Sequence, residues 1–313
     1  MFDLWVWFAL GGAFFQNLRS LQQRRLTATL SRSGASYSRF LYALPLAWLY
    51  LYWWPVPMAA IANGAFLAYC LLGGVAQIVG TWCLVGAVSD AGFASGTAFS
   101  KTEAAQTALI GLLLLADPVD GVLLSAIALS LVGVALLFGA GSREPRASAA
   151  PPGARARTAA LLGLAAGAGF ALAAVCFRGA ALAVAPEVPA SSDSAALLAA
   201  AAWTLAVTLT LQTLLQGLWL ARHGPGELQA VLRGWRRGSL VGVSGMLASL
   251  CWFSGVALYS AAAVRAVGQV EMVFALLTGV LLFRERLTLK ETAGMALIAL
   301  AVVILAVPEG VRA

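Results

Sequence analysis

Charged residues are scarce in this chain. Asp, Glu, Lys and Arg make up 11% of its 313 residues, whereas soluble domains contain roughly 25%. The chain is 61% hydrophobic and its mean hydropathy is +0.88. A water-soluble fold could not bury that much apolar surface, but a bilayer accepts helices of about 20 apolar residues that satisfy their own backbone hydrogen bonds. The composition therefore predicts an all-α polytopic membrane protein with the lipid bilayer as its surroundings.

Residue types that bind metals or catalyse reactions are also few. The single histidine, His223, lies in the loop sequence ARHGPGE, and the four cysteines lie in apolar segments without CxxC spacing. We therefore expect no metal site and assign the cysteines to packing. No GxSxG, HExxH or GxxxxGK[ST] motif occurs, so the sequence indicates neither a hydrolase nor an ATP-driven pump, and no cofactor is expected.

The basic residues do not indicate nucleic acid, although the net charge is +7 and the isoelectric point is near 9.7. The arginines occur in short clusters between apolar runs and form no continuous basic face, so we expect no nucleic-acid partner. The start of the chain, MFDLWVWFALGGAFF, carries Asp3 where a secretory signal has basic residues. We expect this apolar run to remain in the mature protein.

Apolar runs bounded by charges, glycines and prolines predict ten membrane helices. They cover residues 2–18, 34–54, 62–86, 91–116, 119–141, 158–183, 194–220, 238–259, 262–283 and 288–307. Only ADPVDG separates the fourth and fifth spans, and only RERLTLKE separates the ninth and tenth. Both pairs are therefore predicted to be tight helical hairpins.

The two hairpins resemble each other at a constant offset of 168 residues, the separation between Glu103 and Glu271. The same offset aligns Gly111 with Gly279 and Asp117 with Glu285. We therefore predict two five-helix repeats, residues 1–141 and 158–313, joined by a flexible linker, SREPRASAAPPGARAR, at 142–157. Because five is odd, the repeats would be inverted in the membrane, which puts a shared site near the midplane between them.

The basic residues also predict an orientation. The odd-numbered loops hold 15 of the 20 basic residues: Arg19, Arg24, Arg25, Arg32, Arg143, Arg146, Arg155, Arg157, Arg222, Arg233, Arg236, Arg237, Arg284, Arg286 and Lys290. The opposite side keeps Arg178 and Arg312. The positive-inside rule places the odd loops in the cytoplasm and both termini outside, in an inner (plasma) membrane of bacterial type.

Three charged residues lie near the middle of predicted spans: Lys101, Glu103 and Glu271. Each costs roughly 2.5 to 3.5 kcal/mol if it faces lipid, so such residues face a bundle interior or a wet cavity. We expect Lys101 to approach Glu271, and Glu103 to approach Arg39 or Arg265. The alternative is that these ions form a buried tie that holds the repeats together and never contacts substrate.

Polar residues near these charges complete the candidate site. Gln106 and Gln269 lie on the same predicted helices and could line a polar cavity or form interhelical hydrogen bonds. Arg39 lies within SYSRFLYALPLAW, where it could face a cavity or extend toward the cytoplasmic edge of the membrane. The candidate substrate- or ion-binding residues are Lys101, Glu103, Glu271, Gln269, Arg39, Arg265 and Gln106.

The sequence VEMVFALLTGVLLFRERLT at 270–288 resembles the drug/metabolite transporter superfamily, EamA type, whose pattern is E-P, an apolar helix and G-E-R-L. Glu271, Gly279, Glu285, Arg286 and Leu287 match, whereas Met272 replaces the proline and Arg284 replaces the glycine. KTEAAQTALIGLLLLAD matches in the first half, with an alanine in place of the proline. The resemblance implies a ten-helix carrier with a central cavity between the repeats that opens alternately to each side.

These observations favour a secondary transporter, an exporter of small metabolites such as amino acids or related organic solutes. In the absence of an ATP site, an ion gradient would drive transport, and a proton could bind Glu103 or Glu271. A non-transporting membrane scaffold or assembly subunit is the second hypothesis. A membrane-embedded enzyme is the third, and the missing catalytic motifs count against it.

The predicted orientation can be tested with reporters fused at Ala313. We expect a periplasmic reporter such as alkaline phosphatase to be active there and a cytoplasmic fluorescent reporter to be dark, because the basic loops hold the opposite side in the cytoplasm. Activity of the cytoplasmic reporter alone would reverse the assignment.

Overall fold

The computed structural model describes residues 3–26, 29–54, 56–91, 99–140, 152–283 and 288–307. These ranges contain helices and no strand, which confirms the all-α class. Within them, six helices are long and apolar enough to cross a membrane, so the chain is a multi-pass membrane protein. They cover Gly64–Ala87, Arg157–Glu187, Asp193–His223, Trp235–Leu258, Ala261–Thr278 and Leu289–Ala306.

The chain divides into two compact units. Unit 1 consists of Met1–Trp7, Ala76–Val175 and Tyr259–Ala313, and unit 2 consists of Phe8–Val75 and Cys176–Leu258. Each unit combines segments from both predicted five-helix halves, so the repeats of residues 1–141 and 158–313 stay a prediction. Three helices contribute residues to both units: α1 (Leu4–Leu26), α4 (Gly64–Ala91) and α8 (Pro152–Val184).

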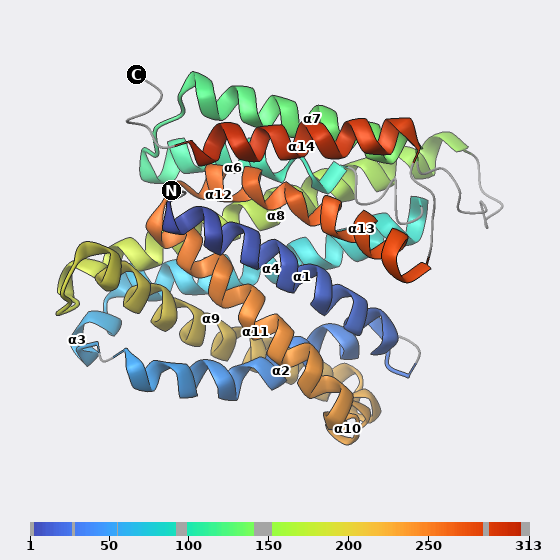
Figure 1. Cartoon of the computed structure of the whole chain (residues 1–313). Helices are drawn as coiled ribbons and strands as arrows, with labels where there is room; N and C mark the ends of the chain where they lie inside the picture. The colour runs from blue at the N-terminus through green and yellow to red at the C-terminus, as the bar shows by residue number, and fades with distance from the viewer. Residues whose placement is uncertain are drawn as a thin grey trace. The chain divides into compact units, whose positions relative to one another are not determined.

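In unit 1, α7 (Gly121–Ala140) and α14 (Leu289–Ala306) pack side by side (Figure 1). Glycines allow the close approach: a Cβ on Gly133 would lie 2.8 Å from the carbonyl oxygen of Gly294, and a Cβ on Gly294 would lie 2.7 Å from that of Gly133. Small residues let membrane helices approach in this way. The buried side chain of Ile298 packs beside this contact.

The predicted helix at 262–283 is not continuous. It consists of α12 (Ala261–Val267), a 3-10 turn, η3 (Gly268–Val270), and α13 (Glu271–Phe283). In the predicted span 91–116, residues 92–98 lie outside the described residues, and a turn at 101–102 precedes α6 (Glu103–Leu115). Ala261–Thr278 is nevertheless one of the six candidate membrane spans, so the ninth predicted span contains a local 3-10 turn and is not lost.

Unit 2 is built around α2 (Arg32–Tyr50), α9 (Asp193–His223) and α11 (Trp235–Leu258), which contact one another. A short helix, α10 (Pro225–Arg233), packs on α2 and α9 through the buried Val231. The sequence analysis assigned this segment to a loop. It missed α10 because the helix is too short to span a membrane, so a search for long apolar runs passes over it.

Other boundaries also differ from the predictions. The second span ends early, with α2 followed by η1 (Leu51–Trp53) and α3 (Met58–Ile61), and η2 (Ala185–Glu187) follows α8. Because α8 begins at Pro152, residues 152–157 of the predicted linker are helical. Residues 142–151 lie outside the described residues. So do Arg143, Arg146, Arg312 and the motif residues 284–287.

The α7–α14 contact generates a stability prediction. Gly133→Ala would place its methyl group against the backbone of α14, which cannot rotate away, so we expect a loss of about 1–3 kcal/mol of stability. The measurement is the unfolding midpoint of the detergent-solubilised protein. Gly121→Ala is the matched control, because a Cβ there meets nothing within 4 Å. Equal midpoints for both variants would contradict the packing.

Candidate functional site

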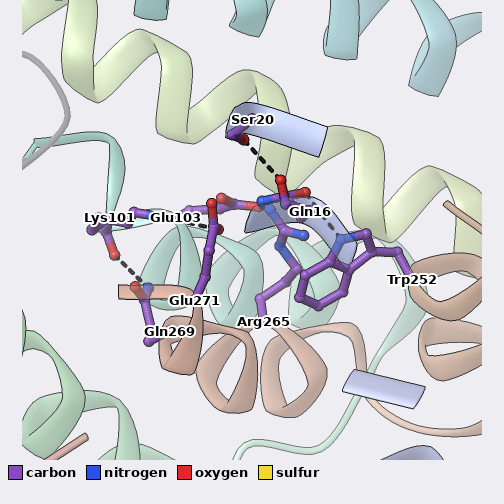
Figure 2. A network of polar contacts seen from close by, with 8 residues as sticks. All are labelled: Gln16, Ser20, Lys101, Glu103, Trp252, Arg265, Gln269 and Glu271. Carbon is purple, nitrogen blue, oxygen red and sulfur yellow. Dashed lines mark hydrogen bonds and ion pairs between the residues drawn. The ribbon is translucent and has the colours of Figure 1, made fainter. Parts of the chain in front are cut away.

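Four charged side chains of unit 1 form two ion pairs. The Nζ atom of Lys101 lies 3.3 Å from Oε2 of Glu271, and Arg265 on α12 pairs with Glu103 on α6. Figure 2 shows these side chains grouped where α6, α12 and α13 meet the turn that carries Lys101. The side chains are 10% to 19% exposed. The structure thus contains the expected Lys101–Glu271 pair, and it selects Arg265 over Arg39 as the partner of Glu103.

Both glutamates begin helices. Glu103 is the first residue of α6 and Glu271 is the first residue of α13. The N-terminus of a helix carries a partial positive charge, which stabilises carboxylates in its first turn. The turn at 101–102 therefore places the Glu103 carboxylate in the first turn of a helix. At Glu271 the helical path continues, because the backbone nitrogen of Glu271 donates to carbonyl oxygens of η3.

Side chains supply the hydrogen bonds that the breaks require. The Nε2 atom of Gln269 donates to the carbonyl oxygen of Lys101 at 2.9 Å. The hydroxyl of Thr102 donates to the carbonyl oxygen of Phe99 at 2.7 Å. Non-helical backbone at membrane depth is tolerated where such partners exist. Thr102 was not singled out in the sequence, although a threonine beside two charges in an apolar run is a signal for such a turn.

The two breaks are related by the sequence offset. Lys101 and Gln269, which are hydrogen-bonded, are themselves 168 residues apart. The same offset relates the starts and ends of α6 and α13 and the starts of α7 and α14. It also relates Asp120, whose carboxylate accepts from the backbone of Leu123 in the first turn of α7, to Thr288, the N-cap of α14. These described helix boundaries of the two hairpins therefore coincide at the 168-residue offset.

The cluster keeps unused hydrogen-bonding capacity. Gln106 donates through Nε2 to the Thr102 hydroxyl at 2.9 Å and to the carbonyl oxygen of Leu164 at 3.4 Å. In the described part of the chain, the buried Oε1 atoms of Gln106 and Gln269 have no hydrogen-bond donor. Since an unsatisfied buried acceptor costs roughly 1–3 kcal/mol, these two atoms are suited to accept a hydrogen bond from water or a solute.

The charges of the cluster balance, with two cations and two anions. Removing one partner of a buried pair costs about 3–5 kcal/mol because the other charge is left uncompensated. A charged solute or a proton that takes the place of one partner would therefore free the other side chain to move. The cluster is suited to exchanging one ion-pair partner for a solute ion or a proton. Its four charged side chains do not form the pairing of a nucleophile with a general base that covalent catalysis needs.

Unit 2 holds the remaining candidate, Arg39, and a polar contact that the sequence analysis missed. Arg39 is half-buried on α2, and its guanidinium carbon lies 4.3 Å from the centroid of the Phe40 ring. On α1, Gln16 accepts a hydrogen bond from the indole of Trp252 at 3.0 Å, and Ser20 donates to the Gln16 carbonyl oxygen at 2.8 Å (Figure 2). The polar residues of FFQNLRSLQQRR recur with helical spacing, which was the signal available for this face.

Comparison with known proteins identifies a family for the C-terminal part of the chain. Residues 158–307 match the sequence model of the EamA-like transporter family. A crystal structure of a protein with 14% sequence identity matches 97% of this chain and 96% of its own, with a TM-score of 0.67, and shows the fold alone. Comparison with curated protein sequences finds no match. The family consists of membrane transporters, which are generally not enzymes. Through residues 158–307, the chain belongs to the EamA-like transporter family.

Proposed function

We propose that the protein is a secondary transporter that exports small organic solutes such as amino acids across a bacterial-type plasma membrane, with both termini outside. The observation that carries this proposal is the cluster of two ion pairs at paired helix breaks, with two unused acceptors beside them. Transporters bind solutes and coupling ions at broken helices whose ends supply partial charges. Family membership supports the same class of function.

The proposed architecture is ten membrane spans in two inverted five-helix repeats. Its support is the register between the hairpins, in which helix boundaries and N-caps recur 168 residues apart. The hydrogen bond between Gln269 and Lys101 joins equivalent positions, as expected for residues close to a pseudo-two-fold axis. Inverted repeats of this kind alternate access by exchanging the conformations of their two halves.

In this proposal the ion pairs respond to solute and protons. A proton or a cationic group of the solute at Glu271 would release Lys101, and Arg265 would continue to hold Glu103. Gln106 and Gln269 would supply hydrogen-bond acceptors to the solute through their Oε1 atoms. The competing function is a scaffold, in which the ion pairs only hold helices together. It is favoured by the fact that both partners of each pair belong to unit 1.

Reconstitution separates these functions. Protein in liposomes should take up radiolabelled solutes from an amino-acid and organic-acid panel, and an imposed pH gradient should accelerate uptake. We expect Glu271→Gln to lower the pH-driven rate at least 10-fold, because the neutral amide can neither bind a proton nor hold Lys101 as an ion. Unfolding midpoints measured in parallel show whether each variant is folded.

Glu187→Gln is the matched control, because Glu187 is exposed in η2. This substitution should leave transport unchanged. A folded Glu271→Gln variant that transports at the wild-type rate would remove Glu271 from the mechanism. A wild-type protein that moves no solute of the panel, under any gradient, would favour the scaffold.

A further inference from the structure

The short helix α10 of unit 2 joins the ends of two candidate membrane spans. Gly224 separates it from α9 and Gly234 separates it from α11, and both α9 and α11 are long and apolar enough to cross a membrane. Figure 1 shows α10 at one end of α11. A helix that connects the ends of two spans lies at the level of the lipid headgroups.

Contacts with the rest of unit 2 fix which face of α10 points outward. The hydroxyl of Tyr42 donates to the carbonyl oxygen of Val231 at 2.8 Å. Leu228 and Val231 pack in a hydrophobic cluster with residues of α2 and α9. Leu232 and Arg233 are exposed. The inward face of α10 is therefore held by packing, and its outward face is available to lipid.

The outward face of α10 and the first turn of α11 carry cations beside an exposed aromatic ring. Leu232 is 53% exposed and Trp235 is 55% exposed. Arg233, Arg236 and Arg237 are exposed as well. The guanidinium carbon of Arg236 lies 5.6 Å from the centroid of the Trp235 ring. Tryptophan rings and long basic side chains at the ends of spans are typical of the membrane–water interface.

A stripe of exposed apolar residues on α11 leads to Arg236. This lipid-facing stripe consists of Leu240, Val243 and Leu247. Its members lie four, seven and eleven residues after Arg236, so they share one face of the helix with it. A phospholipid whose acyl chain packs along the stripe would have its phosphate group at the level of Arg236.

Protein carboxylates do not neutralise these arginines. Within the part of the chain that the structure describes, Arg233, Arg236 and Arg237 form no ion pair. The carboxylate of α10, Glu227, instead accepts a hydrogen bond from the backbone nitrogen of Ser31 at 2.6 Å. Guanidinium groups bind phosphate oxygens with paired, charge-assisted hydrogen bonds, and anionic lipids attract basic residues near the membrane surface.

We propose that Arg233, Trp235 and Arg236 bind the headgroup of an anionic phospholipid, whose acyl chain packs along the lipid-facing stripe of α11. The two guanidinium groups hold the phosphate, and the indole ring lies beside the glycerol region, where tryptophan is favoured. The site requires only that α10 and the start of α11 lie at the membrane boundary, so it goes beyond the proposed transport function and does not depend on it.

Lipid binding is measured on the full chain in neutral detergent by native mass spectrometry, which counts the lipid molecules retained. The probes are phosphatidylglycerol and phosphatidylcholine with the same acyl chains. We expect phosphatidylglycerol to bind more tightly than phosphatidylcholine. Arg236→Gln should raise the Kd of phosphatidylglycerol about 5-fold, the loss expected for one basic residue at an anionic surface, and should leave phosphatidylcholine binding unchanged.

Arg237→Gln is the matched control, because it removes the same charge from the next residue of the same helix. Val241 and Ser244, which lie four and seven residues after Arg237, are buried. Arg237 therefore lies on the face of α11 that packs against protein, about 100° around the helix from Arg236. Its substitution should change the Kd of phosphatidylglycerol much less than that of Arg236.

Arg233→Gln tests the second guanidinium, and it serves in place of Arg236→Gln should that variant fail to fold, as judged by the unfolding midpoint. Equal affinities of the wild type for the two lipids would overturn the proposal. So would unchanged affinity for phosphatidylglycerol in folded Arg233→Gln and Arg236→Gln. Equal losses in Arg236→Gln and Arg237→Gln would also contradict the site, because they would indicate attraction to diffuse charge.

Inorganic phosphate distinguishes a lipid site from a site for soluble anions. Because the proposed site also holds an acyl chain, millimolar phosphate should not displace phosphatidylglycerol from the wild type. Displacement would assign the arginines to a soluble anion and overturn the proposal. The assay contains no transported solute, so a failure of lipid binding and a failure of transport are separate results.

Discussion

The ion pairs of unit 1 are the constraint on which the rest of the structure depends. A lone charge within a membrane span costs roughly 2.5–3.5 kcal/mol, and this chain places four charges in one cluster. The cost is offset by pairing Lys101 with Glu271 and Glu103 with Arg265, and by placing Glu103 in the first turn of α6. Two further features hold the paired side chains in place. Gln269 donates a hydrogen bond to the carbonyl oxygen of Lys101, and α12 packs on α6.

The same constraint links the fold to transport. In the proposed mechanism, one partner of a neutral ion pair is exchanged for a solute ion or a proton, and the unsatisfied Oε1 atoms of Gln106 and Gln269 accept hydrogen bonds from the solute.

Sequence reasoning succeeded where the physical signal is local. The cost of burying Lys101, Glu103 and Glu271 can be read from each residue and its neighbours, and the all-α membrane class follows from hydropathy. It did not locate the turn at 101–102, where the carbonyl oxygen of Lys101 accepts a hydrogen bond from Gln269, 168 residues away. The motif residues 284–287 lie outside the described residues.

Exchange of the paired charges tests the central claim most directly. Lys101→Glu and Glu271→Lys are measured singly and together for unfolding midpoint and for solute uptake in liposomes. Each single change breaks a buried pair, which costs about 3–5 kcal/mol. The account predicts that each single variant loses stability and uptake, and that the double variant regains most of the stability and part of the uptake. A double variant as impaired as the sum of the two single variants would show that the two charges do not depend on each other.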